Sequence, residues 1–117
     1  MALDENLVAR VRSALGRQPG ITERKMFGGL SFLLNGNMCC GVAKDLLVLR
    51  LGEQGAAEAL AQPHTRPMDF TGKPMKSMVY VAPDGFRSDK ALQEWVHRAV
   101  AYAACLRQRT RPRFRKD

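Results

Sequence analysis

The sequence has no long apolar run. Its longest uninterrupted apolar stretch, Ala99 to Leu106, is far shorter than the roughly 18 residues that a bilayer span needs. Asp4 and Glu5 occupy positions where a secretory signal would carry positive charge. With 117 residues, 45% of them hydrophobic, the chain is long enough for one folded domain and too short for two. We therefore expect a single cytoplasmic domain without a membrane segment.

Residues suited to metal binding are few. The chain has three cysteines and two histidines, with neither C-x-x-C nor H-x-x-x-H spacing, so we expect no metal site and no cofactor. The odd number of thiols argues against a disulfide framework. Regular strand alternation would point Cys39 and Cys40 to opposite faces. Either both act as small apolar side chains, or the outward one is a reactive thiol with a small-molecule or redox role.

No catalytic constellation is evident either. Acidic residues occur singly, His64 lies in a proline-rich segment, and His97 falls at the edge of the last predicted helix. The segment Met26-Phe27-Gly28-Gly29 lacks the G-x-x-x-x-G-K-[ST] pattern of a phosphate-binding loop, so a hairpin turn is the favoured interpretation. We expect a protein that is not an enzyme and has no catalytic residues.

What the sequence does have is a cluster of positive charge. The net charge is +8, from 19 lysines and arginines against 11 acids. Six of these cations share the segment 107–117 with one acid: Arg107, Arg109, Arg111, Arg113, Arg115 and Lys116. We predict a domain over 1–106 and a flexible basic tail over 107–117. The tail is either a solvated end or a nonspecific nucleic-acid binder that gains affinity by counterion release.

A second cationic segment surrounds Phe70. Arg66, Lys73 and Lys76 lie near this aromatic residue, a combination that could contact single-stranded nucleic acid. An ordinary packed loop is the favoured interpretation, but these three cations would be the first to test if the tail did not bind DNA.

Helical periodicity marks both ends of the predicted domain. From Asp4 to Leu15 the apolar residues recur at helical spacing, with Asp4 as the N-cap and Gly16 as the stop. A short alanine-rich helix is expected over 53–60. A long last helix begins at Ser88 or Asp89. Its predicted buried stripe is Leu92, Trp95 or Val96, Ala99, Tyr102 or Ala103, and Leu106.

The middle of the chain predicts strands. Between Ile21 and Leu51 the apolar period changes to two, which indicates strands over 21–27, 30–34, 38–43 and 46–51. Their short connections require an antiparallel meander. Segment 62–74 is expected to be a loop with a short strand around 68–70, and 77–82 a further strand. The predicted fold class is α+β, a two-layer structure in which N- and C-terminal helices cover the sheet.

Two packing predictions follow from this assignment. Phe27 belongs to the core, and Gly28 or Gly29 takes a positive φ, because the chain must reverse between two apolar strands within two residues. Trp95 is buried between the last helix and the sheet, because it shares the stripe of Leu92 and Ala99.

Several motifs together resemble the TfoX/Sxy family, over about residues 7 to 106. The most specific is the Met26-Phe27-Gly28-Gly29 turn, preceded by Lys25 and followed by a hairpin. The Gly72-Lys73-Pro74-Met75 segment before the strand of Tyr80, and the L-x-x-W-V-x-x-A pattern that includes Trp95, support it.

The resemblance implies a small α+β domain like the N-terminal domain of that family. The founding members promote natural DNA uptake in bacteria by acting with the cyclic-AMP receptor protein at competence promoters. It therefore implies a noncatalytic role in transcription regulation, with a transcription factor of that type and DNA as partners, and is compatible with a homodimer. No segment after Leu106 resembles the second, helical domain of the full-length regulators, so the competence role is not carried over whole.

Overall fold

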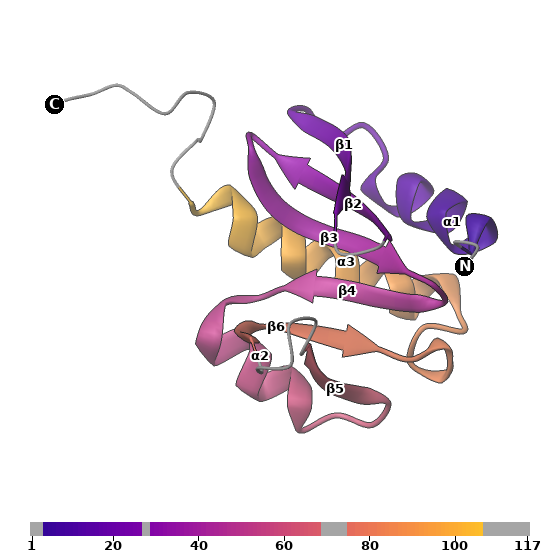
Figure 1. The fold of residues 1–117 in the computed structure, drawn as a ribbon, viewed down its shortest axis with the longest axis vertical. Helices are drawn as coiled ribbons and strands as arrows, with labels where there is room; N and C mark the ends of the chain where they lie inside the picture. The colour runs from indigo at the N-terminus through magenta and orange to yellow at the C-terminus, as the bar shows by residue number, and fades with distance from the viewer. Residues whose placement is uncertain (1–3, 27–28, 69–74, 107–117) are drawn as a thin grey trace, which may run out of the picture.

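One antiparallel sheet organises the fold. The computed structural model describes residues 4–26, 29–68 and 75–106. Its strands are β1 (Ile21–Met26), β2 (Gly29–Leu34), β3 (Asn37–Ala43), β4 (Leu46–Arg50), β5 (Thr65–Met68) and β6 (Met75–Val81). Its helices are α1 (Glu5–Leu15), α2 (Gly52–Leu60), the short 3-10 helix η1 (Pro83–Gly85) and α3 (Asp89–Ala104). The strand order is β1-β2-β3-β4-β6-β5, so the predicted α+β class and antiparallel meander are confirmed (Figure 1).

Turn chemistry sets the hairpins after β2 and β3. Asn35 and Gly36 have φ values of 54° and 85°, the paired positive angles of a tight two-residue hairpin turn. Lys44 takes φ 58° in the next turn. These two predicted turns are confirmed.

The turn before β2 lies at residues outside the described segments. Gly29 is the first residue of β2 and does not have a positive φ, so the predicted positive φ at Gly28 or Gly29 rests on Gly28, which lies outside the described residues together with Phe27. Gly29 is instead needed for close approach of two strands: a Cβ there would lie 2.0 Å from the carbonyl oxygen of Val42.

The second half of the sheet is not sequential. β6 pairs with β4 and leaves β5 at the edge, where Pro67 is tolerated because its missing N–H faces away from the ladder. The strand expected around 68–70 lies earlier, at β5, and β6 begins two residues before the predicted strand.

Side-chain caps start the two long helices. The Asp4 carboxylate accepts the Leu7 N–H at 3.1 Å, and Gly16 ends α1 with φ 59°. The Ser88 hydroxyl accepts the Ala91 N–H at 3.1 Å and starts α3. These caps confirm the predicted starts of both helices.

All three α-helices contribute to a core on one face of the sheet, and α3 lies behind the strands in Figure 1. α1 and α3 also pack against each other: the Arg10 guanidinium donates to the carbonyl oxygens of Phe86 at 2.7 Å and Arg87 at 3.2 Å. The opposite face, called the helix-free face below, carries a smaller cluster. Its members are Met38, Val48, Met68, Met78 and Tyr80.

Candidate functional site

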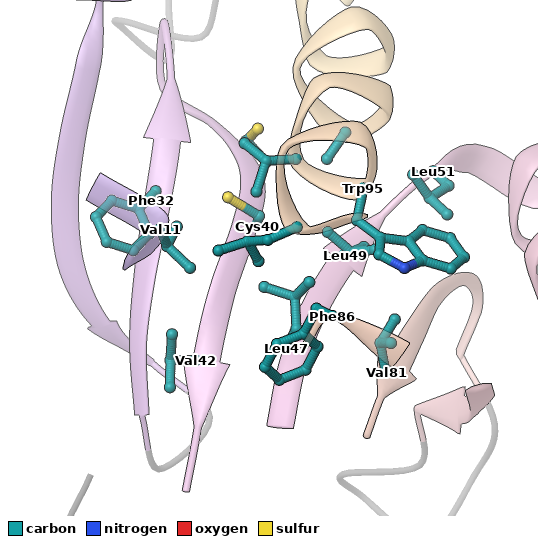
Figure 2. Close-up of a cluster of buried hydrophobic side chains, with 14 of the residues drawn as sticks. Val11, Phe32, Cys40, Val42, Leu47, Leu49, Leu51, Val81, Phe86 and Trp95 are labelled. Atoms are coloured by element: carbon teal, nitrogen blue, oxygen red, sulfur yellow. The ribbon is translucent and has the colours of Figure 1, made fainter. Parts of the chain in front are cut away.

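The adjacent cysteines lie at an irregularity in β3. Leu33 pairs with Met38, whereas Phe32 pairs with Cys40, so Cys39 is an extra residue on this strand. Such a β-bulge interrupts the alternation of side chains. Both thiols are therefore buried in the same core, and the prediction that they point to opposite faces is wrong (Figure 2).

Burial also sets the chemistry of these thiols. A hydrogen bond with Cys39, together with burial, raises the pKa of the Cys40 thiol well above its usual range. A thiol held in its neutral form is a poor nucleophile. The exposed cysteine is Cys105, directly after α3. Neither Cys39 nor Cys40 provides the outward reactive thiol that the redox hypothesis required.

Trp95 is buried, as predicted, with 7% of its surface exposed. Figure 2 shows its indole ring near Leu49 and Leu51. Its Nε1–H donates to the Gly85 carbonyl oxygen at 3.1 Å, and the Arg98 guanidinium lies 5.1 Å from its ring centroid. Trp95 thus joins α3 to the turn that follows β6.

A cleft of about 330 Å³ opens beside Trp95, lined in part by His64, Asp84, Glu94 and Arg98. Sequence reasoning missed this site, because its residues come from three separated segments. The only local signal is the pair of turns Pro63-His64 and Pro83-Asp84-Gly85. His64 adopts φ 69°, an uncommon angle for a residue other than glycine.

The charged groups of this cleft are largely engaged. Arg87 donates to the Asp84 carboxylate at 2.8 Å through Nε, and this hydrogen bond lowers the pKa of Asp84. Arg98 lies 3.9 Å from Glu58 on α2, rather than pairing with Glu94 along α3. An aspartate held as a carboxylate is a weak acid catalyst at neutral pH. Asp84 is therefore poorly suited to donate a proton in this cleft.

A second cleft, of about 230 Å³, lies between α1 and α3 beside Arg10 and Asp89. Arg10 lies 3.3 Å from Asp89 and also binds the two carbonyl oxygens before α3. Its guanidinium is therefore occupied in holding the two helices together.

Metal ligands are not gathered in the described part of the chain, where no group of three or more histidine, cysteine, aspartate or glutamate side chains could hold an ion. None of the described helices is long and apolar enough to cross a membrane.

The predicted nucleic-acid residues fall into two groups. Arg107, Arg109, Arg111, Arg113, Arg115 and Lys116 lie outside the described residues, as do Lys73 and Phe70. Arg66 and Lys76 are exposed. Arg66 pairs with Tyr80 and shares the helix-free face with it, whereas Lys76 lies beside the Met68 and Met78 members of that face, where the β5–β6 register shifts. The Arg66 guanidinium lies 5.0 Å from the ring centroid of Tyr80 on that face.

A comparison with known protein families tests the resemblance to the TfoX/Sxy family that the motifs suggested. The chain matches the TfoX N-terminal domain over residues 13–103. It belongs to the TfoX N-terminal domain family. A comparison with curated proteins gave no match.

The match to the TfoX N-terminal domain includes the motif residues Gly29 and Trp95. Gly29 allows β2 to approach β3, and Trp95 anchors α3, so these two motif residues have structural roles in this chain. Met26 ends β1, while Phe27 and Gly28 lie outside the described residues. The basic segment 107–117 lies beyond the matched range.

Proposed function

We propose that this TfoX N-terminal domain is a noncatalytic accessory domain that regulates transcription through contacts with other macromolecules. The partners are a transcription factor of the cyclic-AMP receptor protein type and its promoter DNA. The match to the TfoX N-terminal domain over residues 13–103 is the observation that carries the proposal.

The chemistry of the described residues supports binding rather than catalysis. Cys39 and Cys40 are buried, Asp84 is bound by Arg87, and Arg10 is occupied between two helices. Reactive groups that are buried or paired are poorly placed to act on a substrate.

The test uses purified cyclic-AMP receptor protein on a fluorescently labelled promoter duplex, titrated with this protein. We expect a larger ternary complex and tighter retention of the receptor protein on the DNA. A duplex without the receptor site serves as the control. An unchanged complex at every concentration, with folded protein confirmed by circular dichroism, contradicts the proposal.

A second candidate function is direct, nonspecific nucleic-acid binding through the tail. Six cations in ten residues, from Arg107 to Lys116, favour it. Binding of this kind falls steeply with salt, with a slope of about −0.9 per phosphate neutralised. If the tail alone binds, replacing its six cations by glutamine abolishes binding to random-sequence DNA. Cys39 and Cys40 are both buried, so neither supplies the outward thiol on which the redox alternative depends.

A further inference from the structure

One row of paired residues crosses the entire sheet. Successive pairs run from Arg24 on β1 through Ser31, Gly41, Val48 and Tyr80 to Arg66 on β5. Val48 and Tyr80 belong to the cluster on the helix-free face, so the whole row lies on that face. The row thus has an arginine at each edge of the sheet. Five strand spacings of about 4.8 Å separate them by roughly 24 Å.

The same face gathers one sign of charge. Lys76 lies on β6 between Met75, whose partner Met68 belongs to the cluster on this face, and Met78, which is itself a member. The β5–β6 register shifts at this point, and the Lys76 side chain is exposed, as are those of Arg24 and Arg66. Every acid in the described segments lies elsewhere, on a helix, at a turn or cap, or on the helix side of β1. They are Asp4, Glu5, Glu23, Asp45, Glu53, Glu58, Asp84, Asp89 and Glu94.

Arg24, Arg66 and Lys76 are available to bind an anion from another molecule. No described acid forms an ion pair with Arg24, Arg66 or Lys76, whereas Arg10, Arg12, Arg87 and Arg98 each have one. Arg17, Lys25, Lys44 and Lys90 also form no ion pair with a described acid, and all but Lys44 supply the matched control below. Arg50 pairs at a position of the same face, but its guanidinium lies 5.8 Å from the ring centroid of Tyr102 on α3, the helix that packs on the opposite face. The ring beside Arg66 is Tyr80, which belongs to the helix-free face itself.

We propose that the helix-free face of the sheet binds the phosphate backbone of duplex DNA through Arg24, Arg66 and Lys76. The inference rests on the proposed function, in which the domain acts at DNA, and names the surface that makes the contact. Phosphate contacts of this kind position a protein on DNA without reading its sequence. Duplex DNA carries one phosphate charge per about 1.7 Å of its axis, so a length of roughly 24 Å carries about 14 charges. The three cations can neutralise only a small part of them. Binding is therefore weak and independent of sequence.

The aromatic content of the face favours duplex over single-stranded DNA. Binding of single strands relies on exposed aromatic rings that stack on bases. Tyr80 is the aromatic residue of this cluster, yet it is 8% exposed and its ring already has Arg66 beside it. Among its described residues, the face offers charge to a backbone and little stacking surface to a base.

The experiment separates this face from the tail. Fluorescence anisotropy measures binding of the full chain to a random duplex of about 20 base pairs, between about 50 and 200 mM salt. The starting protein, called the tail-neutral protein below, has glutamine in place of the six tail cations Arg107, Arg109, Arg111, Arg113, Arg115 and Lys116. In that background, one variant adds R24Q, R66Q and K76Q.

A matched control adds R17Q, K25Q and K90Q, which remove three exposed cations from outside the helix-free face and lower the net charge equally. Thermal melts confirm that each variant is folded. A further variant, R24K with R66K, retains the charge and is expected to retain binding even though the arginine geometry is lost.

We expect the tail-neutral protein to retain DNA binding with a log–log salt slope of about −2.7, one increment of −0.9 for each of three phosphates. The R24Q/R66Q/K76Q variant removes that slope and lowers affinity at least tenfold, while the control keeps the slope. Equal losses in both triple variants would show that net charge alone matters. No residual binding in the tail-neutral protein, or tighter binding to a single strand of equal length, also overturns the inference.

The two proposals fail separately. Suppose that the R24Q/R66Q/K76Q variant forms the ternary complex with the receptor protein and its promoter as well as the wild type does, and that the wild type does not bind free duplex. The accessory role then stands, and the DNA-binding face is wrong. If the wild type forms no ternary complex, while the protein with a glutamine-substituted tail keeps its salt-dependent DNA binding, the DNA-binding face stands and the accessory role is wrong.

Discussion

Cys39 and Cys40 differ in chemistry from a pair of thiols on a regular strand. One extra residue in β3 turns both side chains into the core, where a hydrogen bond with Cys39, together with burial, raises the pKa of Cys40. Adjacent position in sequence therefore predicts neither exposure nor reactivity here.

We expect thiol alkylation of the native protein to modify Cys105 and to spare Cys39 and Cys40, because only Cys105 is exposed. Mass spectrometry after brief treatment with iodoacetamide measures this, and repetition in denaturant should label all three. The C105S variant is the control and should take no label when native. Native labelling of Cys39 or Cys40 at the rate of Cys105 would contradict the burial described above.

Trp95 gives the second prediction at this scale. Truncation to alanine removes a large buried ring and should lower the free energy of unfolding by roughly 3 to 5 kcal/mol. Replacement by phenylalanine keeps much of the apolar surface but removes the hydrogen bond to Gly85, and should cost less. Urea denaturation measures both. A W95A protein as stable as the wild type would show that the ring is not part of the core.

At the scale of elements, Gly29 leaves no room for a side chain between β2 and β3, because a Cβ there would lie 2.0 Å from the Val42 carbonyl oxygen. G29V should destabilise the protein by more than the ~1 kcal/mol of an ordinary mutation, because the added side chain would collide with the Val42 carbonyl. G29A should also destabilise, although φ is not positive at this residue. T22V, at an exposed position of β1, is the control and should be nearly neutral. Thermal melting distinguishes the outcomes, and a G29A melting temperature equal to that of the wild type would contradict the close approach.

Local signals in the sequence predicted most of the elements. Asp4, Ser88 and the Asn35-Gly36 pair act through their immediate backbone neighbours, so a reader of sequence alone can place them. The bulge at Cys39 has no such signal, because it depends on the register between β2 and β3. The placement of β6 between β4 and β5 is likewise a long-range pairing that local periodicity does not encode.

The candidate sites show the same limit. Arg66 and Lys76 could be named as cations from sequence, but the shared face of Arg66 and Arg24 depends on how all six strands pair. The cleft beside Trp95 joins His64 to Asp84 across twenty residues, and composition alone could not bring them together. Spatial clusters become visible only once the strand register is fixed.

At the scale of the molecule, the predicted domain boundary after residue 106 is open to a direct test. The core residues of α3 end at Ala103, so a chain truncated after Leu106 should keep its melting temperature within about 2 °C of the full chain. Differential scanning calorimetry measures this. A larger fall would mean that residues 107–117 stabilise the domain.

The packing of α1 against α3 has a consequence for biosynthesis. These are the first and last helices, and Arg10 reaches across 76 residues of chain to the Phe86 carbonyl. During translation α1 and the strands leave the ribosome before the helix that carries Trp95 and Val96, so their core remains incomplete. A nascent chain stalled before α3 would thus present Leu7, Val11 and the helix-covered strands as a surface for chaperones.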